Sequence, residues 1–221
     1  PPEAGGIDFK SSKAYNKMRK NEEVLDLDKT EQTKQFFDRA AEGWDRSCLH
    51  DPEKLDAIVT LADIRKGARV ADIGCGTGAL FEEILSRNPA ELLGVDLSDR
   101  MIAAAQKKFH DSRLRLLAAD LFDVAETGFD AATIYSAYPH FPDKERLARK
   151  IADMLVEGGR VMVAHSQGKE MINARHRGPE MEQISSPLLP AEQEANHFRK
   201  WFQIDILVDT PQLYLISGIK K

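Results

Sequence analysis

The chain has 221 residues, 42% of them hydrophobic and 30% charged, which is typical of one globular domain of ordinary size with a substantial core. Its formal net charge of −5 argues against a nucleic-acid partner, and no apolar run is long enough to cross a bilayer, so we expect no membrane partner either. Its two cysteines include one inside a glycine-rich loop, where a disulfide would obstruct the loop, so we expect a reducing, cytoplasmic setting.

The N-terminal part differs in character from the rest of the chain. Residues 1–20 are polar and basic, and this pattern predicts an arm that either docks loosely or closes over a ligand. Thr30 is a candidate cap for a helix over 33–41, whose apolar residues recur at helical spacing. We therefore expect residues 1–50 to form an N-terminal arm with a covering helix, and residues 51–221 to form the core.

Residues 69–164 alternate between apolar runs of strand length and amphipathic stretches of helix length, which is typical of parallel βαβ units. Two later apolar runs, 202–208 and 213–217, are joined by a very short link, and a parallel crossover needs about a dozen residues or more, so these strands are antiparallel. We therefore predict an α/β, Rossmann-like fold: a seven-stranded, mostly parallel sheet with helices on both faces and a C-terminal antiparallel hairpin. The earlier strands are expected at 69–73, 91–95, 114–118, 129–135 and 160–164, and the helices between them at 79–86, 99–109 and 144–155.

A long stretch with several glycines and prolines, 165–195, separates the last parallel strand from the hairpin. Its pattern is irregular. Insertions of this length in a compact domain are often lids or binding loops. We expect it to form a substrate-side insertion or lid.

A glycine-rich loop after the first strand carries the strongest chemical signal. The apolar run ends in Gly74, Gly76 and Gly78, and a helix follows. Glycines at this junction let backbone amides approach a ligand closely, at the positive end of the helix dipole. The loop predicts a nucleotide-like cofactor, and its spacing alone also fits the dinucleotide fingerprint. A tight turn without a ligand is the remaining alternative.

Acidic residues follow the next two strands. Asp96 closes the second strand, where it either accepts hydrogen bonds from both ribose hydroxyls or caps the following helix, a role for which Ser98 competes. Asp120 ends the third strand, where it either accepts from the exocyclic amine of adenine or serves as an ordinary turn residue. Ligands of such sheets bind outside the carboxyl ends of the strands, so we expect both acids to converge on the glycine loop.

These motifs together resemble the class I S-adenosylmethionine-dependent methyltransferase family. Residues 36–45 are similar to the segment before the core in its small-molecule enzymes, including the ubiquinone/menaquinone type. The resemblance implies S-adenosylmethionine as cofactor, S-adenosylhomocysteine as its product, and methyl transfer to a small-molecule acceptor. The similarity lies in the loop Asp72-x-Gly74-x-Gly76-x-Gly78, the acid after the second strand, Ala119-Asp120, Phe129-Asp130 and Gly158-Gly159-Arg160.

The resemblance also implies roles for individual residues. Asp72 suits the ammonium of the cofactor's methionine end, Asp96 suits the ribose, and Asp120 suits the edge of adenine. The implied cofactor contacts are Asp72, Gly74, Cys75, Gly76, Gly78, Asp96, Leu97, Met101, Asp120, Leu121 and Tyr135.

Candidate catalytic residues follow the fourth strand, in a loop that faces the transferable methyl group in this family. Methyl transfer is an in-line displacement from a good leaving group, so positioning contributes much of the catalysis, and only some acceptors need a base. His140 titrates near neutrality and is a candidate base, while Tyr138 is a candidate for orienting the acceptor. His165, at the end of the fifth strand, is expected to face the same site. For His140 and Tyr138 the alternative is a structural place in the pocket wall.

Three histidines raise the question of a metal site, since imidazole suits Zn²⁺ and similar ions. His140, His165 and His176 are separated by 25 and 11 residues, which matches no local metal motif. The sequence therefore favours solvated or packed histidines, and we predict no metal.

Two other functions fit parts of the sequence. A nicotinamide-dependent oxidoreductase would also use Gly74, Gly76, Ala79 and Asp96, but the terminal hairpin and Asp120 weaken this interpretation. A non-catalytic S-adenosylmethionine-binding protein would share the loop and the acids, because these concern binding rather than chemistry. Either a monomer or a homodimer is compatible with the sequence.

Overall fold

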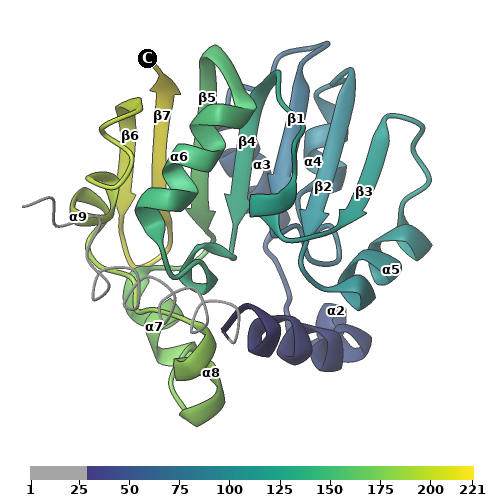
Figure 1. The fold of residues 1–221 in the computed structure, drawn as a ribbon, viewed down its shortest axis with the longest axis vertical. Coiled ribbons are helices and arrows are strands. Elements are labelled where there is room, and N and C mark those ends of the chain that lie inside the picture. The colour runs from purple at the N-terminus through teal and green to yellow at the C-terminus, as the bar shows by residue number, and fades with distance from the viewer. Residues whose placement is uncertain (1–28) are drawn as a thin grey trace, which may run out of the picture.

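The computed structural model describes residues 29–221, so the expectation for residues 1–20 lies outside the described range. A seven-stranded sheet lies between two layers of helices (Figure 1). Its strand order is β3-β2-β1-β4-β5-β7-β6; the first five pair in parallel, and β7 runs antiparallel to β5 and β6. The predicted fold, including the antiparallel hairpin, is confirmed. The strands are β1 (Arg69–Ile73), β2 (Glu91–Asp96), β3 (Leu114–Ala118), β4 (Phe129–Tyr135), β5 (Leu155–His165), β6 (Phe202–Asp209) and β7 (Tyr214–Lys220).

Strand burial follows position in the sheet. β1 and β4 are buried along almost their whole length, because helices cover both faces of a parallel sheet. β6 lies at one edge, and its residues alternate between more buried and more exposed positions.

β5 is longer than the strand predicted at 160–164. Leu155 pairs with Phe129 at its start, and Arg160 pairs with Ala131, so the register shifts between these pairs. Gly158 within the extra stretch has a φ of 74°, which suits the local irregularity. This early pairing is a tertiary contact and leaves no periodic signal in the sequence.

The helices divide into two layers, each with its own core. Helices α3, α4 and α5 cover one face with buried residues such as Ile58, Phe81 and Ile102, while α6 and α9 cover the other with Leu147 and Ala195. The helical bounds are α2 (Trp44–Ser47), α3 (Pro52–Leu61), α4 (Phe81–Ser86), α5 (Asp99–Lys108), α6 (Lys144–Met154), α7 (Lys169–Arg175), α8 (Pro179–Ile184) and α9 (Ala191–Ala195); short 3-10 turns are η2 (Ala41–Gly43), η3 (Leu121–Asp123) and η4 (Tyr138–His140).

Side-chain caps fix where three of these helices begin. Asp51 precedes α3 and accepts from Glu53 N–H, Ser98 precedes α5 and accepts from Met101 N–H, and Asp143 caps α6 in the same way. Ser98, and not Asp96, is therefore the cap of α5, which leaves the Asp96 carboxylate for other partners.

The stretch 165–195 is more regular than predicted, since it contains α7, α8 and α9. Its apolar residues Ile172, Ile184 and Leu188 are buried, and such packing stabilises helices too short to persist alone. In Figure 1, α7, α8 and the N-terminal helix (residues 29–40) lie along the edge of the sheet where the parallel strands end. Two segments far apart in sequence thus cover the same edge.

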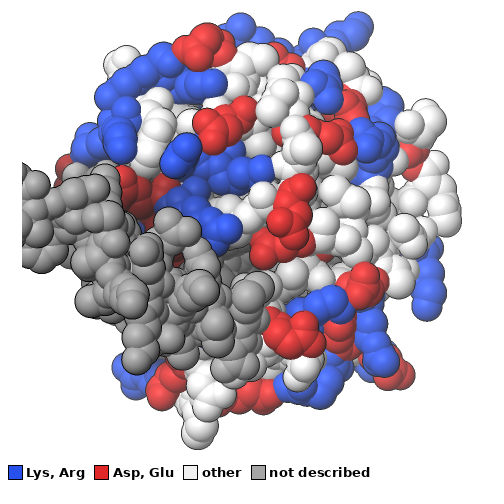
Figure 2. Space-filling model, in the orientation of Figure 1, with Lys and Arg blue, Asp and Glu red and all other residues white. Residues whose placement is uncertain are grey.

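The outer surface carries charges of both signs. Figure 2 shows Lys and Arg side chains interspersed with Asp and Glu over the visible face. Within residues 29–221, no helix is long and apolar enough to cross a membrane.

Candidate functional site

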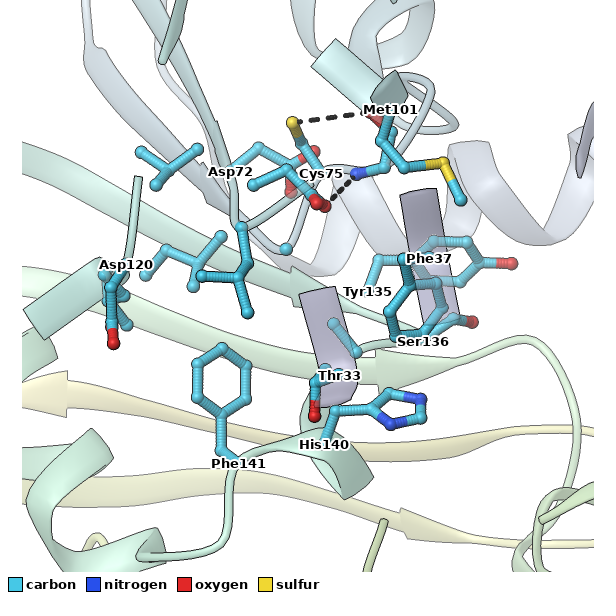
Figure 3. Close-up of a pocket in the computed structure, with 18 of the residues that line it drawn as sticks. Thr33, Phe37, Asp72, Cys75, Met101, Asp120, Tyr135, Ser136, His140 and Phe141 are labelled. Carbon is cyan, nitrogen blue, oxygen red and sulfur yellow. Dashed lines mark hydrogen bonds between the residues drawn. The ribbon is translucent and has the colours of Figure 1, made fainter. Parts of the chain in front are cut away.

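A pocket that is partly open to solvent lies at the carboxyl ends of the parallel strands (Figure 3). The loops after β1, β2, β3 and β4 contribute its inner wall, and the N-terminal helix and the segment after it contribute its cover. The expected convergence of strand ends is therefore observed. Of the residues expected to contact a cofactor, those that line the pocket are Asp72, Gly74, Cys75, Gly76, Asp96, Leu97, Met101, Asp120, Leu121 and Tyr135.

The glycine loop has backbone conformations that other residues adopt only with strain. Gly74 and Gly76 have φ values of 66° and 54°. A Cβ at Gly74 would lie 2.5 Å from the Ala137 Cβ, whereas a Cβ at Gly76 would meet no atom of the described residues within 4 Å. Gly76 therefore leaves open space at the pocket wall. Gly78 does not line the pocket; its Cβ would clash with the Phe81 ring, so packing explains this glycine.

Asp96 holds the glycine loop from the end of β2. Its Oδ2 accepts from Gly76 N–H at 2.7 Å, and its Oδ1 accepts from Ser98 N–H at 2.8 Å. Burial raises the pKa of Asp96, while these two backbone donors act in the opposite direction. The carboxylate is thus fixed in orientation at the pocket wall, with lone pairs left for a polyol.

Asp72 is a buried carboxyl beneath the loop. Only 2% of the residue is exposed, and its Oδ1 accepts from Thr133 Oγ1 at 2.6 Å. Burial, reinforced by the charge of Asp96, raises the pKa of Asp72 to about 7. A cationic group beside Asp72 would favour its ionised form, so this position suits an ammonium.

Asp120 caps the turn after β3 and also lies at the pocket wall. Its Oδ1 accepts from Phe122 N–H at 2.9 Å and so caps the η3 turn, yet the residue also lines the pocket. Leu97, Met101 and Leu121 line the same region and provide apolar surface for a flat ring.

The N-terminal segment is tied to the site by polar contacts. Thr77 Oγ1 donates to Asp45 Oδ1 at 2.5 Å, which joins the segment to the glycine loop. Ser98 Oγ donates to Asp38 Oδ1 at 2.6 Å, which joins the N-terminal helix to the start of α5. The segment therefore covers the pocket through specific bonds as well as through apolar residues.

His50 is a site residue that the sequence argument missed. It lines the pocket, and its Nδ1 lies 2.9 Å from the Tyr135 hydroxyl, which donates to Ser166 Oγ at 2.7 Å. Burial lowers the pKa of His50 and keeps the imidazole neutral near pH 7. No local motif marks His50; the only sequence clue is its place just before the Asp51 cap.

Tyr138 occupies a different place from the one expected. It is fully buried, does not line the pocket, and its hydroxyl donates to Glu194 Oε2 at 2.8 Å. The Lys144 ammonium donates to the Tyr138 carbonyl and lies 4.0 Å from the ring centroid. A role in orienting the acceptor does not fit this position, because the hydroxyl is engaged in the core. Tyr138 instead ties the loop after β4 to α9.

The two other predicted catalytic histidines differ in position. His140 lines the pocket, whereas His165 is 1% exposed and does not line it. His140 contacts the Phe37 ring edge to face, with ring centroids 4.9 Å apart. Burial and the charge of His176 lower the pKa of His140 to about 3, so its imidazole is neutral. Within residues 29–221, neither ring nitrogen of His165 has a hydrogen-bond partner.

The sequence matches a known family and several curated proteins. Residues 70–159 match the family described as "Methyltransferase domain". The ubiquinone biosynthesis O-methyltransferase of Xylella fastidiosa is 30% identical over 165 residues, and that of Neisseria meningitidis is 33% identical over 138 residues. These matches cover 69% and 57% of this chain but only 63% and 58% of the relatives, so the chain spans less than two thirds of their length.

Solved structures share the fold at low identity. The N-methyltransferase NodS from Bradyrhizobium japonicum, in complex with S-adenosyl-L-homocysteine, has a TM-score of 0.67 at 17% identity, covering 86% of this chain and 98% of that one. The DhpI–SAH complex has a TM-score of 0.69 at 20% identity, covering 86% and 96%. At these identities the likeness concerns the fold alone.

Proposed function

The chain carries a domain of the class I S-adenosylmethionine-dependent methyltransferase family, and we propose that it transfers the methyl group of S-adenosylmethionine to a small-molecule acceptor. One observation carries this proposal: the left-handed backbone at Gly74 and Gly76 and the carboxylate of Asp96 line the same pocket at the carboxyl edge of the sheet. A nucleoside with an amino-acid tail needs both, because the loop serves the tail and the carboxylate serves the ribose.

The residues around the pocket fit this cofactor. Asp72 is buried and accepts from the Thr133 hydroxyl, with no cationic hydrogen-bond partner in the described part of the chain, and an ammonium beside it would favour its charged form. Asp96 has a fixed carboxylate for the ribose hydroxyls, and Leu121 and Asp120 suit the face and the edge of adenine. When bound, the cofactor supplies an electrophilic methyl group. The chain's own residues then have to orient the acceptor and exclude water.

The cover of the pocket favours an acceptor with an apolar or aromatic body. Phe37 and Trp44 come from the N-terminal segment, and Tyr135 and Phe141 come from the end of β4 and the loop after it. Aromatic walls bind flat apolar groups well and leave polar contacts to fix orientation. The names of the ubiquinone O-methyltransferase relatives support a small-molecule acceptor as well.

We assign the proton-accepting role, where the acceptor needs one, to His50. His50 is neutral, lines the pocket and is oriented through Nδ1 by the Tyr135 hydroxyl, as a general base requires. His140 is the alternative from the sequence, but its Nδ1 faces the Ile184 carbonyl and its Nε2 faces His176. His140 therefore fits the pocket wall better than the role of base.

Calorimetry followed by an acceptor screen tests the proposal. The purified chain should bind S-adenosylmethionine and S-adenosylhomocysteine, and it should release S-adenosylhomocysteine with at least one of a panel of phenols, thiols, amines and quinone precursors. Binding of NAD(P)H without binding of either sulfur cofactor would instead favour the oxidoreductase. Cofactor binding without turnover on any acceptor would favour a binding protein.

A further inference from the structure

Two histidines from separate elements face each other beside the pocket, and of the two only His140 lines it. His140 belongs to the η4 turn after β4, and His176 follows directly after α7. Their Nε2 atoms lie 3.3 Å apart. The other nitrogen of each ring faces a backbone carbonyl: His140 Nδ1 lies 3.1 Å from Ile184 O, and His176 Nδ1 lies 2.8 Å from Ile172 O.

These carbonyl contacts determine where the protons are. A carbonyl oxygen only accepts hydrogen bonds, so both Nδ1 atoms carry a hydrogen. In the neutral rings both Nε2 atoms are then unprotonated, and their lone pairs face each other. Two converging lone pairs at this distance require an electrophile between them or beside them.

The separation of the two nitrogens fits a metal ion bound by both. With Zn–N bonds of about 2.0–2.1 Å and a tetrahedral angle of about 109°, two ligand nitrogens lie about 3.3–3.4 Å apart. A hydrogen bond between the two nitrogens would need a hydrogen on one of them, and neither carries one when both Nδ1 atoms are protonated and the rings are neutral. The observed 3.3 Å matches the edge of a metal tetrahedron.

The rings are also held as metal ligands usually are. Histidine ligands typically donate their second ring N–H to a carbonyl or carboxylate, which fixes both tautomer and orientation. Both rings have this contact, and the Phe37 ring packs edge to face on His140. Figure 3 shows His140 at the wall of the pocket near Phe37 and Thr33.

Although the sequence predicts no metal, we propose that His140 and His176 bind a divalent transition-metal cation such as Zn²⁺ through their Nε2 atoms. Within residues 29–221, no group of three or more His, Cys, Asp or Glu side chains is arranged to hold a metal, so the pair supplies two ligands. The other coordination positions take water or another small donor, which makes the ion exchangeable. Lys144 opposes a cation electrostatically, but its ammonium is bound to the Tyr138 carbonyl and its pKa is lowered to about 8.

Zinc titration of the tag-free full chain, freed of metal with a chelator, tests the site. We expect about one equivalent of Zn²⁺ to bind, and His176→Gln to weaken this binding at least about tenfold, because each ligand lost removes a direct metal bond. His140→Gln should have the same effect, and Co²⁺ should give a visible spectrum of tetrahedral type in the unmodified chain only. His110→Gln is the matched control, since it removes an exposed imidazole elsewhere.

Several outcomes contradict the proposal. Binding of less than about a tenth of an equivalent by the unmodified chain would overturn it, as would equal binding by the unmodified chain and both pair variants. A thermal melt of each variant shows whether it folds. If His140→Gln does not fold, the result for His176→Gln, at a partly exposed position, decides the question. The titration contains no methyl donor, so its result is independent of methyl transfer.

Discussion

The Asp96 carboxylate accepts a hydrogen bond from the backbone N–H of Gly76 at 2.7 Å, so the acid at the end of β2 shapes the loop that follows β1. Its other oxygen accepts from Ser98 N–H at 2.8 Å. One side chain therefore orders the glycine loop and presents its remaining lone pairs to the pocket. Loss of this carboxylate should weaken cofactor binding in two ways: the ribose contact is missing, and the glycine loop is less well ordered.

Asp96→Ala should weaken S-adenosylhomocysteine binding by about 100-fold or more, since it removes charge-assisted bonds of about 1.5–3 kcal/mol each. Asp96→Asn should weaken it less, because the amide keeps one acceptor oxygen but turns a donor toward a backbone N–H. Isothermal titration calorimetry measures both. Asp123→Asn, at an exposed acid in the η3 turn, is the control and should bind normally. Normal binding by Asp96→Ala would remove Asp96 from the cofactor site.

Asp72 should make the cofactor-free chain less stable as the pH rises. Its pKa is raised to about 7 in the folded state from an ordinary value of 3.8, so between these values the folded state binds the extra proton. The free energy of unfolding therefore falls as the pH rises from about 4 to 7, by an amount of up to about 4 kcal/mol.

Asp72→Asn should remove this dependence, because an amide of the same shape has no proton to lose. Urea unfolding at pH 5 and pH 8 should show the variant gaining stability relative to the unmodified chain at the higher pH. Thr133, whose hydroxyl donates to Asp72, can donate to the amide oxygen in the same way. Parallel pH curves for the two proteins would show that Asp72 is already ionised in the folded chain.

Tyr138→Phe should lower stability and leave cofactor affinity unchanged. The substitution removes the bond to Glu194, a carboxylate only 3% exposed, and an unsatisfied buried group costs about 1–3 kcal/mol. Tyr214→Phe is a matched control, since its hydroxyl donates to the neutral Leu189 carbonyl and should cost less. Chemical denaturation gives the stability and calorimetry gives the affinity. An unchanged denaturation midpoint together with lost turnover would show that Tyr138 acts in catalysis.

The parts of the fold that could be predicted have local signals. The β1 strand, the glycines at 74 and 76 and the acid at 96 each stand out within a few residues, and the parallel alternation brings them to one edge. The early start of β5 was missed because Leu155 joins the sheet only through its pairing with Phe129. Short helices within 165–195 were missed because buried contacts, not periodicity, stabilise them.

The other contacts of the site join residues that lie far apart in the sequence. His50 and Tyr135 are 85 residues apart, and His140 and His176 are 36 apart, so no spacing rule relates them. For Tyr138 the sequence suggested a place in the pocket, whereas the side chain lies in the core. Its position in the loop after β4 pointed to the pocket, but whether a side chain turns outward or into the core depends on partners such as Glu194.

His50→Gln provides the sharpest test of the chemistry. If His50 removes a proton from the acceptor, this variant should lower kcat by about 10²- to 10⁴-fold while leaving S-adenosylmethionine affinity nearly unchanged. The lowered pKa of His50 places the acidic limb of the pH–rate profile below the ordinary histidine value of 6.5, and the variant should lose that limb. Tyr135→Phe should have a smaller effect, because it removes only the bond that orients the ring. His110→Gln serves as the control for loss of an imidazole. Undiminished turnover in His50→Gln would show that His50 is not the base.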